Sequence, residues 1–131
     1  MAKKTKSKLK YIHCDIYKRS VAIFFGELDD FLAELNSASE NDAEHNEEVV
    51  NSIKELYEER TLTNACCMSY EGDIYIYAKK KPSLGVMVHE SGHATMFILD
   101  IVGINAHEST EAYAYLLEYL FNGYMDLNKN I

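Results

Sequence analysis

The chain has 131 residues, of which 47% are hydrophobic and 26% are charged. This size and mix are typical of one globular domain and argue against two stacked domains. The 13 Lys and Arg against 21 Asp and Glu leave a formal net charge of −8, which argues against a protein whose whole surface binds nucleic acid. No stretch approaches the roughly 18 uninterrupted apolar residues of a membrane span. We therefore expect a soluble, cytoplasmic protein with no membrane partner.

Charge is distributed unevenly along the chain. Residues 1–10 hold five lysines and no acidic residue, so the remainder carries a net charge of −13. The lysines are not followed by the apolar run of a signal peptide. We expect residues 1–10 to form a flexible basic arm and residues 11–131 to form a single domain. Nucleic acid is an expected partner only weakly, through phosphate contacts of this arm.

The three cysteines argue against a secreted disulfide framework. Their number is odd, and Cys66 and Cys67 are neighbours that would close only a strained ring. In a strand, their side chains would face opposite sides of the sheet. Cys14 lies beside His13, but no second cluster of Cys and His stands at zinc-finger spacing. We therefore expect structural roles for all three cysteines.

The first half of the chain predicts a strand pair and two helices. Residues 11–17 and 20–25 are rich in β-branched and aromatic side chains, which indicates two strands joined by a short polar turn. Apolar residues at helical spacing predict an amphipathic helix over 27–35. The strongly acidic segment 43–60 keeps one apolar stripe, which is typical of a helix with one solvated face.

The second half predicts a hairpin followed by two helices. Strands are expected over 64–70 and 73–78, with a turn at Glu71-Gly72. A helix capped by Ser83 is expected from Leu84 to about Val102, and a final helix from about Ser109 through about Leu120. The predicted fold class is α+β, a small antiparallel sheet packed with helices.

One motif in the predicted Leu84–Val102 helix carries chemistry. The sequence His89-Glu90-Ser91-Gly92-His93 matches the HExxH pattern. Histidines at i and i+4 lie one helical turn apart, so both imidazoles can point at one metal ion, for which Zn²⁺ is the expected cofactor. Glu90 lies on the same side of the helix, where it can act as the general base on a metal-activated water.

A catalytic zinc site usually has three protein ligands and one open position. A third ligand must therefore come from a residue downstream of His93. The candidates are Glu111, Glu108, His107 and Glu118. Glu118 lies two turns beyond Glu111, which favours a supporting or surface position for it.

The segment from Val86 to Tyr119 resembles the zincin metallopeptidases, and among them the gluzincins, in which a second helix returns a glutamate to the metal. The resemblance is carried by the run 89–94 and by Glu111-Ala-Tyr-Ala-Tyr, which is similar to a stretch found in small zincin-like proteins, many of them from phages and prophages. It implies that Glu111 is the third ligand. Glu108 would serve if the final helix began sooner, and His107 lacks the fixed Gly-x-x-His spacing of zincins with three histidines.

Other residues near the motif have two interpretations each. Tyr115 and Tyr119 share a helix face and either pack between the last two helices or hydrogen-bond a ligand or a developing oxyanion. Asp100 lies two turns after His93, where it either supports a ligand or is exposed to solvent. The zincin resemblance implies that the strand 73–78 lies at a sheet edge and holds extended peptide substrate.

We therefore expect a minimal zinc-dependent metallopeptidase, encoded by a phage or prophage, that hydrolyses a peptide or protein substrate. The alternative is a zincin-like binding or assembly protein, such as a virion component, with a phage or host protein partner and a structural or vestigial metal. The short chain motivates this alternative, because it leaves little room for a substrate cleft. A DNA-interacting regulator is disfavoured by the acidic body and by the lack of a helix-turn-helix pattern.

Overall fold

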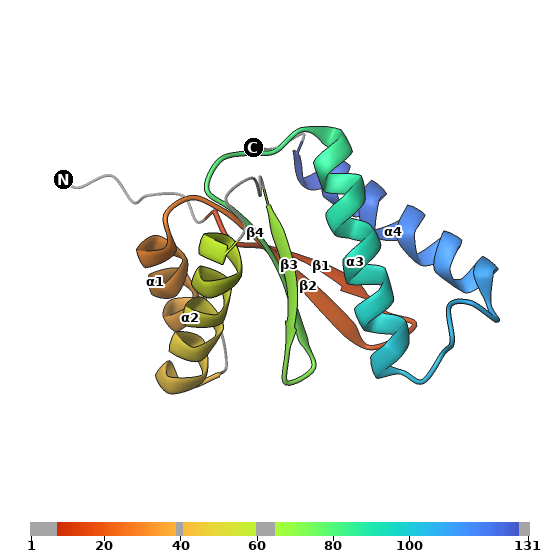
Figure 1. Cartoon of the computed structure of the whole chain (residues 1–131), viewed down its shortest axis with the longest axis horizontal. Helices are drawn as coiled ribbons and strands as arrows, with labels where there is room; N and C mark the ends of the chain where they lie inside the picture. The colour runs from red at the N-terminus through yellow and green to blue at the C-terminus, as the bar shows by residue number, and fades with distance from the viewer. Residues whose placement is uncertain (1–7, 39–40, 60–64, 129–131) are drawn as a thin grey trace.

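The computed structural model describes residues 8–38, 41–59 and 65–128. Within these ranges the chain forms strands and helices in the order β1 (Lys10–Cys14), β2 (Arg19–Phe25), α1 (Leu28–Ala38), α2 (Ala43–Glu59), β3 (Cys66–Tyr70), β4 (Asp73–Ala78), α3 (Leu84–Ile101) and α4 (Thr110–Asn128) (Figure 1). This order confirms the predicted α+β class and every predicted element. The largest difference in extent is at α4, which continues well beyond the predicted end at Leu120.

The strands form one sheet in the order β1-β2-β4-β3. The β1–β2 and β3–β4 pairs are antiparallel hairpins, whereas β2 and β4 pair in parallel, with Val21 opposite Ile74. The sheet is therefore mixed, where an antiparallel one was expected. Turn residues define each hairpin locally, but the side on which the second hairpin joins the first depends on the path of the chain through α1 and α2.

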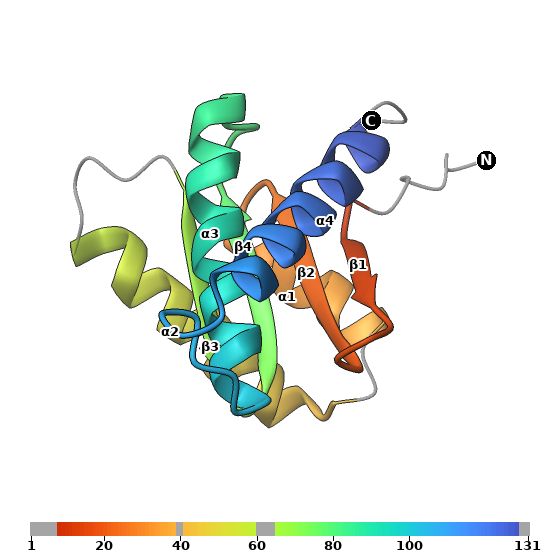
Figure 2. The same cartoon turned by 90° about the vertical axis from the view of Figure 1, so that its right-hand side faces the viewer.

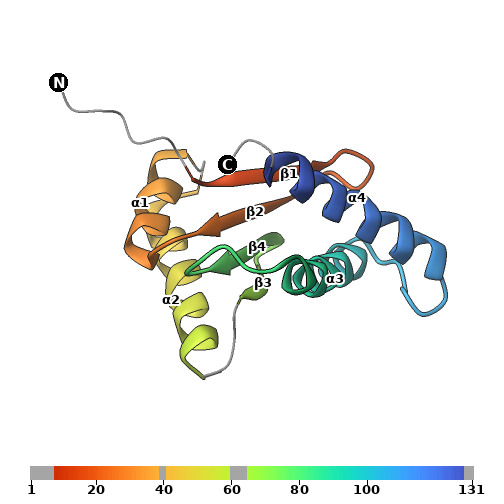
Figure 3. The same ribbon diagram turned by 90° about the horizontal axis from the view of Figure 1, so that it is seen from above.

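Helices cover both faces of the sheet. Figure 3 shows α1 and α2 on one side and α3 and α4 on the other. Helix α3 packs on β3 and β4, and α4 packs on β1, so that α4 crosses the opposite half of the sheet (Figure 2). The protein is therefore a three-layer structure with helix pairs outside and the sheet in the middle.

Successive side chains of each strand point to opposite faces of the sheet and so contribute to two hydrophobic cores, one on each face. In β4, Ile74 and Ile76 face α3 and α4, whereas Tyr75 and Tyr77 face α1 and α2. Phe31 of α1 stacks on Tyr77, with ring centroids 5.9 Å apart. Both faces of this strand are therefore buried, as its near-continuous apolar sequence requires.

The position of β4 corrects one expectation. It lies between β2 and β3, so its backbone is paired on both sides and does not offer a free edge to a peptide. The edge strand next to α3 is β3, which pairs only with β4. The two hairpins meet through β2 and β4 because those strands carry the apolar residues that both cores need.

The chain before β1 is partly integrated into the fold. Leu9 is buried, and the backbone N–H groups of Lys8 and Leu9 donate to the carboxylate of Glu34 in α1. These residues belonged to the predicted basic arm, of which residues 1–7 lie outside the described residues. Among the described helices, none combines the length and apolar character needed to cross a bilayer.

Candidate metal centre

The HExxH motif lies in α3, whose start is set by local sequence. Pro82 precedes the helix, and the side chain of Ser83 accepts a hydrogen bond from the N–H of Val86 at 3.3 Å. This confirms the expected N-cap and satisfies one of the free N–H groups of the first turn. Met87 and Ala94 are buried against the sheet, which fixes the rotation of the helix and leaves both motif histidines exposed.

His89 and His93 face one another across one turn. Their Nε2 atoms lie 3.1 Å apart, and their rings are nearly perpendicular, with centroids separated by 4.7 Å. A tetrahedral ion with Zn–N bonds of about 2.0–2.1 Å would hold two such nitrogens roughly 3.3 Å apart. The pair therefore fits two adjacent ligand positions around one Zn²⁺ ion.

Glu90 lies beside the histidines but is turned toward the protein. Only 6% of its surface is exposed, yet it lines a cavity of about 330 Å³ together with His89 and His93. Residues 65–69 also line it, and 66–69 belong to the edge strand β3. We call this cavity the histidine groove; its remaining lining residues are Leu56 and Phe97.

Cys67 is a groove residue for which the sequence predicted only a structural role. Its side chain packs on the α3 side of the sheet, and Cys66 packs on the other side, as expected for neighbours in a strand. Burial, reinforced by the negative charges of Glu90 and Cys66, raises the pKa of the Cys67 thiol well above its ordinary value. Without a bound ion the thiol is therefore protonated at neutral pH and is not a nucleophile.

The candidates for a third ligand lie at the start of α4 and in the loop before it. Glu111 is exposed in the first turn of α4, and Glu108 and His107 are exposed in the loop. In the described parts of the chain, no group of three or more His, Cys, Asp and Glu side chains is placed to hold a metal ion. The structure thus brings His89, His93 and Glu90 together, and it leaves the third candidate outside this group.

Helix α4 nevertheless approaches the motif closely. A Cβ atom built on Gly92 would lie 3.2 Å from the hydroxyl oxygen of Tyr113. The small residue inside the motif thus leaves room for the Tyr113 side chain of α4 against α3. Glu111 stands two positions before Tyr113 on the same helix, about 200° away around the helix axis, so the two side chains leave α4 in nearly opposite directions. A third ligand at Glu111 would therefore require a rearrangement of this part of the chain.

Other candidate residues have structural or peripheral positions. Tyr119 donates a hydrogen bond to the carbonyl oxygen of His13 at 2.6 Å and so ties α4 to β1. Tyr115 is 68% exposed and does not pack between the last two helices. Asp100 lines a separate cavity of about 590 Å³ with His107 and Tyr113. Glu118 is exposed.

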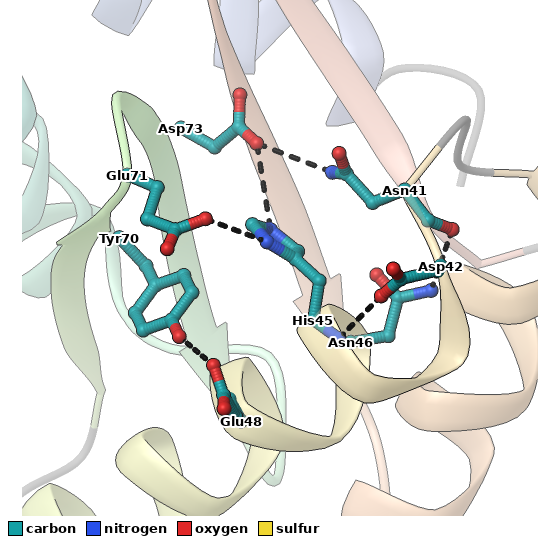
Figure 4. Close-up of polar contacts among 8 residues, drawn as sticks. All are labelled: Asn41, Asp42, His45, Asn46, Glu48, Tyr70, Glu71 and Asp73. Atoms are coloured by element: carbon teal, nitrogen blue, oxygen red, sulfur yellow. Dashed lines mark hydrogen bonds and ion pairs between the residues drawn. The ribbon is translucent and has the colours of Figure 1, made fainter.

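A second polar cluster fixes the strand that forms the groove wall (Figure 4). His45 of α2 contacts Glu71 in the β3–β4 turn through Nδ1 at 3.1 Å, and its Nε2 atom lies 3.7 Å from Asp73. Tyr70 at the end of β3 donates a hydrogen bond to Glu48 of α2. These contacts hold the β3–β4 hairpin against α2 and thereby position β3 relative to α3.

The histidine groove therefore combines a histidine pair, a buried carboxylate and an edge strand. Comparisons of the chain with protein-family models, with curated proteins and with solved structures found no match.

Proposed function

We propose that the chain is a zinc-dependent metallopeptidase of the zincin type that hydrolyses a peptide or protein substrate, as the resemblance to phage and prophage proteins also suggests. His89, His93 and Glu111 would hold the ion. The observation that carries the proposal is the 3.1 Å separation of the His89 and His93 Nε2 atoms at a groove that Glu90 also lines. A bound ion would supply Lewis-acid chemistry by lowering the pKa of water and polarising a peptide carbonyl.

The role proposed for Glu90 is that of the general base. Its carboxylate would accept a proton from the attacking water and deliver that proton to the nitrogen of the leaving amine. Burial supports this role, because a carboxylate in a narrow, partly apolar groove is held in place and shielded from bulk solvent. A side chain on a rigid helix also keeps its position between substrate molecules.

The substrate would lie along β3. This strand pairs with β4 on one side, and its residues 66–69 line the groove. An extended peptide can add to such an edge through backbone hydrogen bonds, which fix its position independently of most side chains. The scissile carbonyl would then pass between β3 and the histidines of α3. The groove would thus serve as the substrate cleft, for which the short chain leaves little other room.

The proposal is tested by metal analysis of the purified chain and of Glu90→Gln and His89→Ala. We expect about one zinc per chain in the wild type and in Glu90→Gln, and less zinc in His89→Ala. Hydrolysis of a casein or a peptide mixture should be lost in Glu90→Gln. A wild-type chain that retains no zinc at neutral pH would rule the proposal out.

A second candidate is a zincin-like binding or assembly protein with a structural or vestigial metal. The exposed position of Glu111, apart from the histidine pair, favours it. This candidate predicts that zinc raises the melting temperature, that Glu90→Gln retains zinc, and that neither the wild type nor Glu90→Gln hydrolyses peptides. Loss of a hydrolytic activity in Glu90→Gln with zinc retained would decide for the peptidase.

A further inference from the structure

A third cavity, at the start of α3, is strongly basic. Its volume is about 420 Å³, and it is lined by the three consecutive lysines Lys79, Lys80 and Lys81, followed by Pro82 and Ser83, with Tyr57 and Val86 at its sides. We call it the lysine hollow. All three lysines are exposed, and Lys79 also approaches Glu27 at 3.8 Å. Since the chain carries 13 Lys and Arg against 21 Asp and Glu, three adjacent cations are a marked local reversal of charge.

The charge of the hollow comes from side chains rather than from the end of the helix. Ser83 already accepts the N–H of Val86, which satisfies part of the first turn of α3. The ammonium groups of Lys80 and Lys81 have no ion pair among the contacts of the described residues. Both side chains are exposed, so an anionic group that enters the hollow can reach them.

The lysine hollow adjoins the histidine groove on three elements. On α2, Tyr57 lines the hollow and the preceding Leu56 lines the groove. On α3, Val86 lines the hollow and His89, less than one turn later, lines the groove. Cys66 pairs with Tyr77, so the start of β3 lies beside the end of β4, from which the lysines continue. One end of the groove therefore lies beside the lysine hollow.

We propose that the lysine hollow binds an acidic side chain of the peptide that occupies the histidine groove, so that the substrate class is peptides with Asp or Glu near the cleaved bond. The inference rests on the proposed peptide substrate. Val86 and the middle of the motif are five residues apart on α3, which is roughly 7–8 Å along the helix axis. An extended peptide advances about 3.3 Å per residue. The acidic residue is accordingly placed about two to three residues from the scissile bond.

The test measures binding without cleavage, in the full chain carrying Glu90→Gln. The probes are fluorescently labelled, amidated octapeptides with two adjacent glutamates at one end, in both orientations, and their glutamine isosteres. At 50 mM salt we expect the glutamate peptide of one orientation to bind roughly five- to tenfold more tightly than its isostere, since two exposed ion pairs contribute modestly. This preference should fall below about twofold at 500 mM salt.

Two double variants test whether the preference for the glutamate peptide depends on the lysine hollow. Lys80→Gln/Lys81→Gln should abolish it, whereas Lys8→Gln/Lys18→Gln, which removes the same charge from exposed lysines elsewhere, should preserve it. The proposal is overturned if the Glu90→Gln chain shows no preference for the glutamate peptide, or if Lys80→Gln/Lys81→Gln keeps that preference. It is also overturned if both double variants lose the preference equally. Because cleavage is not measured, a charge preference that depends on Lys80 and Lys81 supports the hollow even if the chain proves to lack peptidase activity.

Backbone amide chemical shifts provide an independent readout. The glutamate peptide should perturb the amides of Lys80, Lys81 and 83–86 and those of 67–69 in the same titration, because one peptide spans both cavities. Perturbation at the lysines alone would overturn the proposal that the hollow serves the groove. This outcome would not bear on the peptidase proposal, which is tested separately by the zinc content and by the activity of Glu90→Gln.

Discussion

The hydroxyl of Tyr113 lies so close to Gly92 that a Cβ atom there would be 3.2 Å from its oxygen. Replacing a glycine inside a helix by alanine ordinarily stabilises a protein by about 1 kcal/mol. Because Tyr113 must shift to admit the methyl group, we expect Gly92→Ala to gain about half of this amount or less. In a Tyr113→Phe background, which lacks the hydroxyl oxygen, we expect Gly92→Ala to give the full stabilisation of about 1 kcal/mol. Urea denaturation of the wild type, the two single variants and the double variant measures the coupling between positions 92 and 113. Equal gains in stability with Tyr113 and with Phe at position 113 would contradict the contact.

The same substitution should have the opposite sign at Gly123. A Cβ atom built there would lie 2.9 Å from Cγ2 of Ile12, a core residue of β1. Overpacking of this kind costs about 1–3 kcal/mol, so we expect Gly123→Ala to lower the free energy of unfolding despite its better helix propensity. Asn122→Ala, at the exposed neighbouring position, is the matched control and should be neutral or slightly stabilising. Chemical denaturation that ranks the two variants the other way would show that α4 does not pack on β1 as described.

These contacts illustrate what could be predicted from the sequence and what could not. Features set within a few residues were predicted correctly. Glu71 and Gly72 both have positive φ, at 48° and 88°, as a tight hairpin turn requires, and Ser83 caps α3. The histidine pair belongs to this class, since i and i+4 spacing on a helix brings two side chains together without tertiary information.

Features that depend on distant segments were not predicted. Tyr119 bonds to the carbonyl of His13, 106 residues away, and no local pattern indicates that partner. Likewise, β3 rather than β4 is the edge strand, because the hairpin joins β2 through its second strand. The two members of a hairpin have similar composition, so their order in the sheet is decided by tertiary packing.

The third ligand is the clearest case of missing tertiary information. The loop between α3 and α4 is shaped by Asn105, whose side chain accepts hydrogen bonds from the N–H groups of His107 and Glu108. This turn sets where α4 begins, and therefore where Glu111 lies relative to His93. The resemblance to gluzincins supplied Glu111 as a candidate, but spacing alone also allowed Glu108 and His107.

The buried thiol of Cys67 predicts how stability depends on pH in the metal-free protein. Burial raises the pKa of this thiol in the folded state, so the unfolded chain loses its proton first as pH rises. Below the pKa of the thiol in the unfolded chain, about 8.5, the thiol is protonated in both states and does not make stability depend on pH. Above this pKa, the free energy of unfolding falls by about 1.4 kcal/mol per pH unit until the thiol of the folded protein also loses its proton.

Cys67→Ser should reduce this slope between pH 8.5 and 9.5. The variant keeps Tyr77, whose pKa burial raises to about 12, so both proteins should still lose stability above pH 10. Denaturation midpoints measured at half-unit pH intervals, with a chelator present throughout, provide the comparison. Identical slopes for the two proteins would show that Cys67 is not buried beside Glu90.

Charge-neutralising substitutions at the start of α4 should identify the third ligand. If Glu111 binds zinc with His89 and His93, Glu111→Gln should weaken zinc affinity by at least about 100-fold, since loss of even a supporting partner of a ligand costs about 10–100-fold. Glu108→Gln removes the same charge from an exposed position three residues earlier, in the loop before α4, and should leave the affinity within about threefold of the wild type. Competition with a chromogenic chelator measures both. If Glu108→Gln is the damaging change, the helix that supplies the ligand begins earlier when zinc is bound, and if neither is damaging, the two histidines hold the ion without α4.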